Sequence, residues 1–187
     1  MIHFYLVRHA HADWQPDENR GLSTQGQLAA AHVAMVLAPY PIRAIYASPY
    51  QRAIETVEPF AQQRDLPIVT LPALRERQLA GEPVADFAQA VEAVWRDPHF
   101  AHLGGESNVG AQQRGVAALE ELRHSHNDGE HIVLATHGNL LALILQHYDQ
   151  TIGYAFWKAL TMPDVYRLSL GSHGATEIER IYREPIS

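Results

Sequence analysis

Short apolar runs alternate along this chain with longer segments in which apolar residues recur at helical spacing. The runs lie at residues 2–8, 42–47, 67–71 and 131–136. Near-continuous apolar runs of this length are typical of strands that are covered on both faces. The segments between and after them predict helices at about 24–38, 49–63, 86–96, 108–124 and 139–147.

Three of the predicted helix starts carry capping signals. Ser23 or Thr24 can cap the helix at 24–38, and Ser107 can cap the helix at 108–124. Ser48-Pro49 predicts a third start, with Ser48 as the N-cap and Pro49 in the first helical position.

The order of these elements indicates the fold class. Strand and helix alternate over most of the length, which is the signature of a mostly parallel sheet with helices on both faces. Residues 164–170 and 175–182, joined by residues 171–174, predict a terminal antiparallel hairpin. No linker or repeat divides the 187 residues. We therefore expect a single α/β domain over residues 1–187, built as a three-layer α/β/α sandwich.

Composition and charge narrow the classes of function. The apolar fraction of 47% and the charged fraction of 19% are ordinary for a globular protein. The formal net charge of −7 disfavours a nucleic-acid partner, which requires a basic surface. No apolar run reaches the roughly 18 residues of a membrane span. The sequence has no cysteine and no signal-peptide pattern, so we expect a cytoplasmic protein without a membrane partner.

Three of the predicted strand-to-helix junctions carry residues that are costly to bury. The first strand ends in Arg8-His9, the second is followed at short distance by Arg52, and the strand at 131–136 is followed by His137. Right-handed crossovers place the carboxyl ends of parallel strands at one edge of the sheet, where open α/β sheets bind ligands. We therefore expect these four side chains to share one crevice.

Each of the four also has a plain structural interpretation. His9 and His137 could be hydrogen-bonded core histidines, Arg8 could pair with an acid, and Arg52 could lie on the surface. However, Arg52 lies near the first turn of a helix, where the macrodipole disfavours a cation unless an anion is bound. Two arginines and two histidines together suit a phosphoryl group. Arginine presents a planar fork to phosphate oxygens, a neutral imidazole can attack phosphorus, and a protonated one, as expected for His137, can stabilise negative charge.

The segments LVRHA, SPYQRAIET, LRE, GGES and ATHGN, in this order, resemble the histidine phosphatase superfamily, the phosphoglycerate-mutase-like proteins, over about residues 3–171. The resemblance implies that His9 is the nucleophile and becomes a phosphohistidine. It implies that Arg8 and Arg52 bind phosphate and that His137 is the second histidine of the phosphate pocket. Glu76, in LRE, matches the proton donor to the leaving group.

The same resemblance supplies further candidates. Leu22-Ser23 matches the start of the family's first helix, and we expect Ser23, Gly138 and Asn139 to contribute to substrate binding. Glu76 should stay protonated near neutral pH if it is the acid. It lies between two arginines, so an exposed ion-pairing glutamate is the alternative, with Glu82 as a second candidate for the acid. No metal or other cofactor is required by this chemistry.

Three departures from the family pattern bear on specificity. Ala10 stands where the family often has glycine, so its methyl group could crowd the substrate. His11 stands where glutamate or glutamine is common, and it could extend the pocket or be solvated. The insertion that usually covers the substrate is short, at about residues 77–106, which argues against a dedicated mutase.

The leading hypothesis is a metal-independent phosphatase that hydrolyses phosphomonoesters through phosphohistidine. The alternatives are a protein phosphohistidine phosphatase, a phosphoglycerate-type mutase and a non-catalytic phosphate-binding module. The expected partner is a small phosphorylated metabolite or a phosphorylated protein. An exposed edge of the terminal hairpin could pair between chains, so the oligomeric state is open.

Overall fold

The computed structural model describes residues 1–15, 17, 19–171 and 174–182, and for residues 174–176 the backbone alone. The described residues form a six-stranded sheet in the order β3-β2-β4-β1-β5-β6. Its strands are β1 (Ile2–Arg8), β2 (Ile42–Ala47), β3 (Ile68–Thr70), β4 (His131–Thr136), β5 (Asp164–Gly171) and β6 (Gly174–Arg180). The strands β3, β2, β4 and β1 pair in parallel, whereas β5 and β6 add an antiparallel edge.

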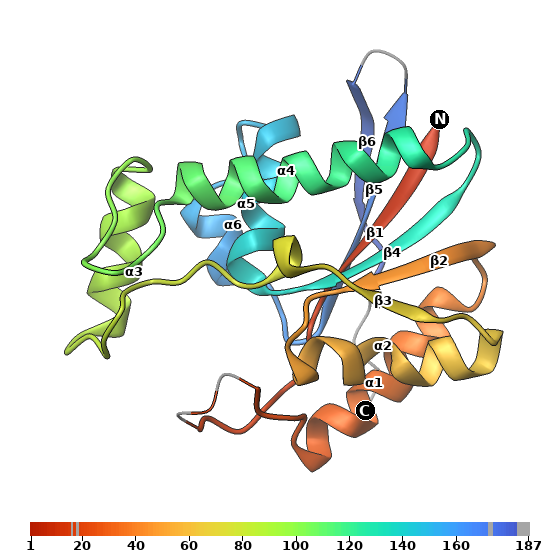
Figure 1. The fold of residues 1–187 in the computed structure, drawn as a ribbon, viewed down its shortest axis with the longest axis horizontal. Helices are drawn as coiled ribbons and strands as arrows, with labels where there is room; N and C mark the ends of the chain where they lie inside the picture. Colours follow the sequence, from red (N-terminus) through yellow and green to blue (C-terminus); the bar gives the residue numbers. More distant parts are fainter. Residues whose placement is uncertain (16, 18, 172–173, 183–187) are drawn as a thin grey trace.

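Helices cover both faces of this sheet (Figure 1). One face carries α1 (Thr24–Leu37) and α2 (Gln51–Arg64), and the other carries α4 (Asn108–Ser125), α5 (Gly138–Tyr148) and α6 (Tyr154–Ala159). The helix α3 (Phe87–Arg96) projects away from the sheet beyond the start of α4. The three-layer α/β/α class and the antiparallel terminal edge are therefore confirmed.

The strand residues alternate between two apolar cores because successive side chains point to opposite faces. Ile2, Phe4 and Leu6 of β1 pack in the core beneath α4 and α5. Tyr5 and Val7 of the same strand pack in the core beneath α1 and α2. Burial on both faces explains why the strand reads as one continuous apolar run.

Most predicted boundaries agree with the structure to within two residues, and the caps at Ser23 and Ser107 are confirmed. Each of these hydroxyls accepts the backbone N–H three residues ahead. The predicted start at Ser48-Pro49 is wrong, because α2 begins at Gln51 with Tyr50 as its N-cap. The structure adds α6 and a short 3-10 helix, η1 (Pro72–Leu74), which the pattern did not indicate. Residues 172–173 of the predicted hairpin turn lie outside the described residues.

The segment 77–106 leaves the sheet and returns as one unit that contains α3. Its two ends are joined by backbone hydrogen bonds from Gly81 N to Leu103 O (2.8 Å) and from Glu106 N to Gln78 O (2.7 Å). Gly104, with φ of +71°, lies against Gly81, where a Cβ would come within 2.8 Å of the Gly81 Cα. This contact requires glycine at position 104 and keeps the two ends of the segment side by side.

Candidate active site

Strand register brings the two candidate histidines together. Arg8, the last residue of β1, pairs with Thr136, the last residue of β4, so that His9 and His137 each follow a paired position. The His9 N–H extends the ladder by donating to Thr136 O (3.0 Å). As a result, the two rings lie edge to face with centroids 5.1 Å apart. The parallel pairing of two buried strands is therefore enough to place both imidazoles at one point.

His9 is held in a single tautomer. Its Nδ1 lies 2.7 Å from the carbonyl oxygen of Ala10, which can only accept, so Nδ1 carries the proton. Its Nε2 is left with a lone pair and accepts a hydrogen bond from Nε of Arg52 at 3.3 Å. Burial, together with the positive charges of Arg52, Arg8 and Arg20, lowers the pKa of His9 to about 3. The ring is therefore neutral and presents Nε2 as a nucleophilic atom.

His137 is fully buried at the N-cap of α5. Its Nε2 is 2.8 Å from the hydroxyl of Ser48, whereas its Nδ1 is buried without a hydrogen-bond partner. Burial, followed by the influence of His9 and Arg52, lowers its pKa well below 6.5. The expectation of a protonated His137 is therefore wrong for this arrangement, because the sequence did not reveal how completely the ring is enclosed. An imidazole nitrogen without a partner remains available to an incoming group.

The guanidinium of Arg8 is held by two backbone carbonyl groups that lie far from it in the sequence. Its Nη1 donates to the carbonyl oxygens of Leu160 (2.8 Å) and Thr161 (3.2 Å), and its Nε is buried without a partner. Burial lowers the pKa of Arg8, and the nearby carboxylates of Glu76 and Asp164 oppose that shift. A Cβ at Gly138 would lie 2.9 Å from Arg8 Nε, so the glycine makes room for the guanidinium.

Arg52 is buried in the first turn of α2, with only 5% of its surface exposed. Its guanidinium lies over the ring of Tyr50, with Cζ 4.7 Å from the centroid. The Thr56 hydroxyl donates to Arg52 O (2.7 Å) and accepts the N–H of Ala10 (2.9 Å). Thr56 therefore joins the first turn of α2 to the loop that carries His9.

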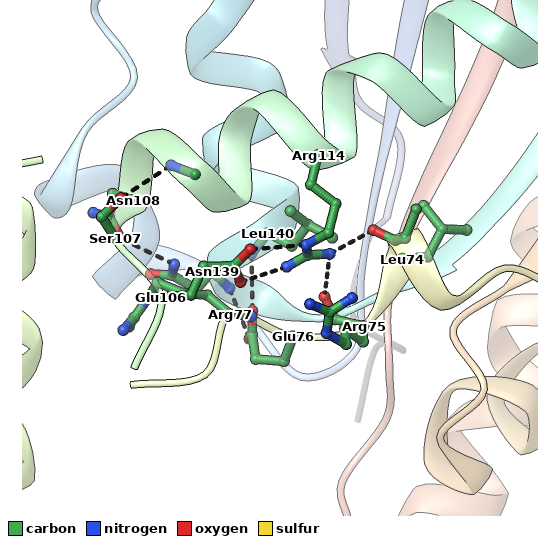
Figure 2. Close-up of polar contacts among 12 residues, drawn as sticks. Leu74, Arg75, Glu76, Arg77, Glu106, Ser107, Asn108, Arg114, Asn139 and Leu140 are labelled. Atoms are coloured by element: carbon green, nitrogen blue, oxygen red, sulfur yellow. Dashed lines mark hydrogen bonds and ion pairs between the residues drawn. The ribbon is translucent and has the colours of Figure 1, made fainter. Parts of the chain in front are cut away.

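Glu76 lies at the opposite side of the site, on the N-terminus of α5 (Figure 2). Its Oε2 accepts the N–H of Asn139 (3.0 Å), and its Oε1 accepts those of Leu140 (3.0 Å) and Arg77 (2.9 Å). A carboxylate here satisfies two N–H groups at the helix start and complements the macrodipole. Glu76 therefore caps α5 and also faces the cavity described below.

Arg114 of α4 holds the segment that carries Glu76 (Figure 2). It donates to the carbonyl oxygens of Ala73 (2.5 Å) and Arg75 (3.1 Å). Its Nε and Nη2 also bind the two oxygens of Glu106 at 2.9 and 2.8 Å. This two-point ion pair ties η1 and the end of the 77–106 segment to one helix.

An open cavity of about 420 Å³ lies beside these groups. Its charged lining consists of Arg20, Arg52, Arg75, Arg77, Glu76 and Glu82. Its apolar and aromatic lining includes Trp14, Tyr50, Leu79, Val84 and Phe87. Arg52 both lines the cavity and bonds to His9, so the cavity lies next to the candidate nucleophile, although His9, Arg8 and His137 are not themselves among its lining residues. Its size falls within the range of small-molecule sites.

A family model for the histidine phosphatase superfamily (branch 1) matches residues 4–180. The chain belongs to this superfamily. A solved mycobacterial glucosyl-3-phosphoglycerate phosphatase, Rv2419c in complex with VO3, is similar with a TM-score of 0.75 and 26% identity. The match covers 89% of this chain and 92% of that one. The phosphoglycerate-mutase-like fold is therefore confirmed.

Two curated relatives are similar in sequence. An uncharacterized protein of Mycobacterium tuberculosis, Rv0525, is 34% identical over 126 residues, 62% of this chain and 60% of the relative. Phosphoserine phosphatase 1 of Hydrogenobacter thermophilus is 27% identical over 140 residues, 67% of this chain and 66% of the relative. The match thus spans somewhat less than two thirds of each relative. Among the described residues, no helix has both the length and the apolar character needed to cross a bilayer.

Other candidates from the sequence have their side chains engaged elsewhere. The Ser23 hydroxyl caps α1 and lies 2.8 Å from Nδ1 of His11. The Asn139 side chain accepts from Nε1 of Trp95 (3.1 Å) and contacts Asn108 (3.4 Å). Ala10 is fully buried. None of Ser23, Asn139, His11 and Ala10 is among the residues that line the cavity, and substrate binding by Ser23, Gly138 and Asn139 stays a prediction.

Sequence reasoning missed several residues at the site. Arg20 lines the cavity, and its charge lowers the pKa of both His9 and His137. Arg77 lines the cavity with most of its guanidinium buried. Ser48 was interpreted as a helix cap but bonds to His137. The two arginines stand in polar loops without periodicity, so their sequence context carried no signal.

Proposed function

We propose that this chain is a phosphatase that hydrolyses phosphomonoesters through a phosphohistidine on His9, without a requirement for metal. The observation that carries the proposal is the fixed tautomer of His9, with a neutral ring and the Nε2 lone pair beside Arg52. A neutral imidazole is the form that attacks phosphorus. Membership of the superfamily and the two named phosphatases among the similar proteins support the same reaction.

In the first step, Nε2 of His9 bonds to phosphorus while the bond from phosphorus to the leaving oxygen breaks. Arg8, Arg52 and Arg20 stabilise the charge on the three equatorial oxygens, and Nδ1 of His137 is available as a further contact. The departing alkoxide needs a proton. Glu76 can supply it from Oε2, because that oxygen accepts one N–H whereas Oε1 accepts two.

In the second step, water attacks the phosphohistidine and gives its proton to Glu76. The bond between nitrogen and phosphorus breaks, its electron pair returns to Nε2, and inorganic phosphate leaves. The Nδ1–H bond to Ala10 O keeps the ring oriented during both steps. Glu76 and His9 are then in their starting forms.

The first test is turnover of p-nitrophenyl phosphate in the presence of EDTA between pH 4 and 8, with a rapid acid-free quench to trap a phosphoenzyme. We expect phosphate release and a phosphorylated protein. His9→Ala should abolish both, whereas His124→Ala, at an exposed histidine in the last turn of α4, should leave turnover unchanged. Normal turnover in His9→Ala would exclude the proposed nucleophile, and the absence of turnover at every pH would contradict the function.

A second candidate is removal of phosphate from phosphohistidine in proteins. It is favoured by the engagement of Glu76 as the acceptor of three backbone N–H groups at the start of α5, because a phosphoramidate depends less than an ester on a separate acid. The substrate in either case would be a small phosphorylated metabolite or a phosphorylated protein, covered by residues 77–106 of one cytoplasmic domain. A phosphohistidine peptide and an alkyl phosphate, compared at equal concentration, separate the two candidates.

A further inference from the structure

The helix α1 lies at the margin of the molecule (Figure 1), and its outer side exposes apolar side chains in a regular row. Leu28 and Met35 are 73% and 68% exposed, and Ala31 lies exposed between them. Thr24 and Ala38 continue the row at its two ends and are exposed as well. The steps along the row are four, three, four and three residues, which is the spacing of a coiled-coil seam. The row therefore has the pattern by which one helix packs against another.

The opposite side of α1 is already buried within the protein. Val33, Ala34 and Leu37 pack in the core beneath α1 and α2. A surface helix ordinarily carries charged or polar residues on its outer side, whereas a helix that is apolar all round is covered all round. Residues 21–42 contain no Asp, Glu, Lys or Arg, and this is the longest such stretch of the sequence. The helix thus has the composition of one that is covered on both sides.

The charge of the chain bears on which partner can cover this side. The formal net charge is −7, so two copies repel each other unless the surfaces that meet are uncharged. The helices α2 and α3 expose charged side chains, Glu58 and Arg64 on α2 and Glu92 and Arg96 on α3. The row on α1 has no such group, so two copies can meet there without bringing like charges together.

The row is also complementary to itself. The small residue Ala31 lies between the larger Leu28 and Met35, which are about two helical turns apart. When a second α1 lies antiparallel on the first, Ala31 faces Ala31 of the second copy, and Leu28 faces its Met35. Each contact then occurs twice about a two-fold axis, which is the isologous arrangement of most dimers.

A hollow of about 360 Å³ beside Leu28 can receive the methionine of the second copy. Its lining includes Leu28, Ala29 and His32 of α1, together with Met162, Pro163 and Tyr182. None of the described residues that line it is Asp, Glu, Lys or Arg. Methionine is flexible and fills irregular apolar gaps, so an exposed methionine suits such a hollow.

We propose that this chain forms a two-fold dimer through the outer sides of two antiparallel α1 helices. Met35 of each copy packs over Leu28 of the other and into the hollow beside it. The edge of β6 takes no part in the contact. This pairing does not depend on the proposed phosphatase reaction.

The test is the mass of the full chain in solution, measured by sedimentation equilibrium at about 1–100 µM, because the population of a dimer depends on concentration. We expect twice the mass of one chain. Leu28→Glu/Met35→Glu should raise the dissociation constant at least about a hundredfold, because four carboxylates would meet in the contact. Val69→Glu, at an exposed apolar residue of β3, is the matched control and should leave the dissociation constant unchanged. Circular dichroism establishes that each variant keeps its helices.

A variant with opposite charges tests the antiparallel arrangement. Leu28→Lys/Met35→Glu brings opposite charges together if the helices are antiparallel and like charges together if they are parallel. We expect it to associate about tenfold more tightly than Leu28→Glu/Met35→Glu. Equal dissociation constants for the two variants would overturn the antiparallel arrangement.

Two further outcomes would overturn the dimer as proposed. The mass of one chain at every concentration would show that copies do not pair, and would leave the outer side of α1 to a different protein. A dimer that Leu28→Glu/Met35→Glu does not weaken would place the contact on another surface, such as the edge of β6.

Discussion

Arg52 donates from Nε to Nε2 of His9 across 3.3 Å, in a part of the protein that is almost fully buried. Because a cation faces the lone pair of the imidazole, protonation of His9 is opposed by charge as well as by burial. The same guanidinium lies where it can bind the oxygens of a phosphoryl group that approaches Nε2. One contact therefore keeps the ring neutral and supplies positive charge for the transition state.

We predict that Arg52→Lys lowers kcat/KM for p-nitrophenyl phosphate by about a hundredfold to a thousandfold. Lysine keeps the charge but lacks the planar fork that holds two phosphate oxygens at once. Steady-state kinetics measure the change. Arg64→Lys, the same replacement at the exposed end of α2, serves as control and should alter kcat/KM less than twofold. A comparable loss in both variants would show that the effect comes from the helix and not from the site.

Glu76→Gln should affect stability and catalysis in different ways. The amide offers one acceptor oxygen where the carboxylate offers two to the start of α5, so we expect a loss of about 1–3 kcal/mol in the free energy of unfolding. If Glu76 also gives the proton, kcat should fall about a hundredfold for an alkyl phosphate and much less for p-nitrophenyl phosphate, whose leaving group needs no acid. Urea unfolding and kinetics with both substrates measure the two effects. An equal loss with both leaving groups would leave Glu76 as a helix cap alone.

The fold could be predicted from the sequence because its determinants are local. The central strands β1 and β4 are near-continuous apolar runs, and the side chains of Ser23 and Ser107 cap their helices as predicted. The helix α6 was missed because it spans six residues and has no capping side chain. The helix start predicted at Ser48-Pro49 was wrong because Ser48 takes part in a tertiary contact, its hydrogen bond with His137, instead of capping α2.

The candidate site was predicted only in part, for a similar reason. The positions of Arg8, His9, Arg52 and His137 follow from topology, which places strand ends at one edge. The protonation of His137 does not, since it depends on how completely the ring is enclosed. Arg20 and Arg77 reach the cavity from loops, where side-chain direction has no period that a sequence pattern could reveal.

Acid should destabilise the protein through its buried histidines. The pKa of His9 is about 3 in the folded chain and ordinarily 6.5, so the unfolded chain binds more protons between these values. This contribution to stability is complete above about pH 6.5 and is lost as the pH falls toward 3. His137 acts in the same direction.

The measurement is chemical unfolding at pH 7 and pH 4 for the parent protein and His9→Asn. We expect the parent to lose more stability than the variant over this interval, by a difference on the order of 3 kcal/mol, from 1.36 kcal/mol per pKa unit. His99→Asn, a change at an exposed histidine, should follow the parent. Parallel curves for His9→Asn and the parent would show that His9 is not buried in its neutral form.

Gly138→Ala should disturb phosphate binding without unfolding the protein. The new Cβ would lie 2.9 Å from Nε and 3.0 Å from Cζ of Arg8, so the guanidinium must move. Such overpacking costs about 1–3 kcal/mol, and we expect affinity for phosphate or vanadate to fall about tenfold or more. Inhibition constants for vanadate measure it. Gly153→Ala is the matched control, because no atom lies within 4 Å of its added Cβ, and equal inhibition constants for the two variants would disprove the steric argument.

The two carbonyls behind Arg8 make catalysis sensitive to a part of the chain that never meets the ligand. Leu160 and Thr161 belong to the connection between α6 and β5, more than 150 positions from the arginine that they hold. A change in the sequence of this connection, whether natural or engineered, would change the position of the Arg8 guanidinium relative to the reacting phosphorus. Turnover could thus be tuned from outside the binding surface, with every residue that touches substrate left as it is.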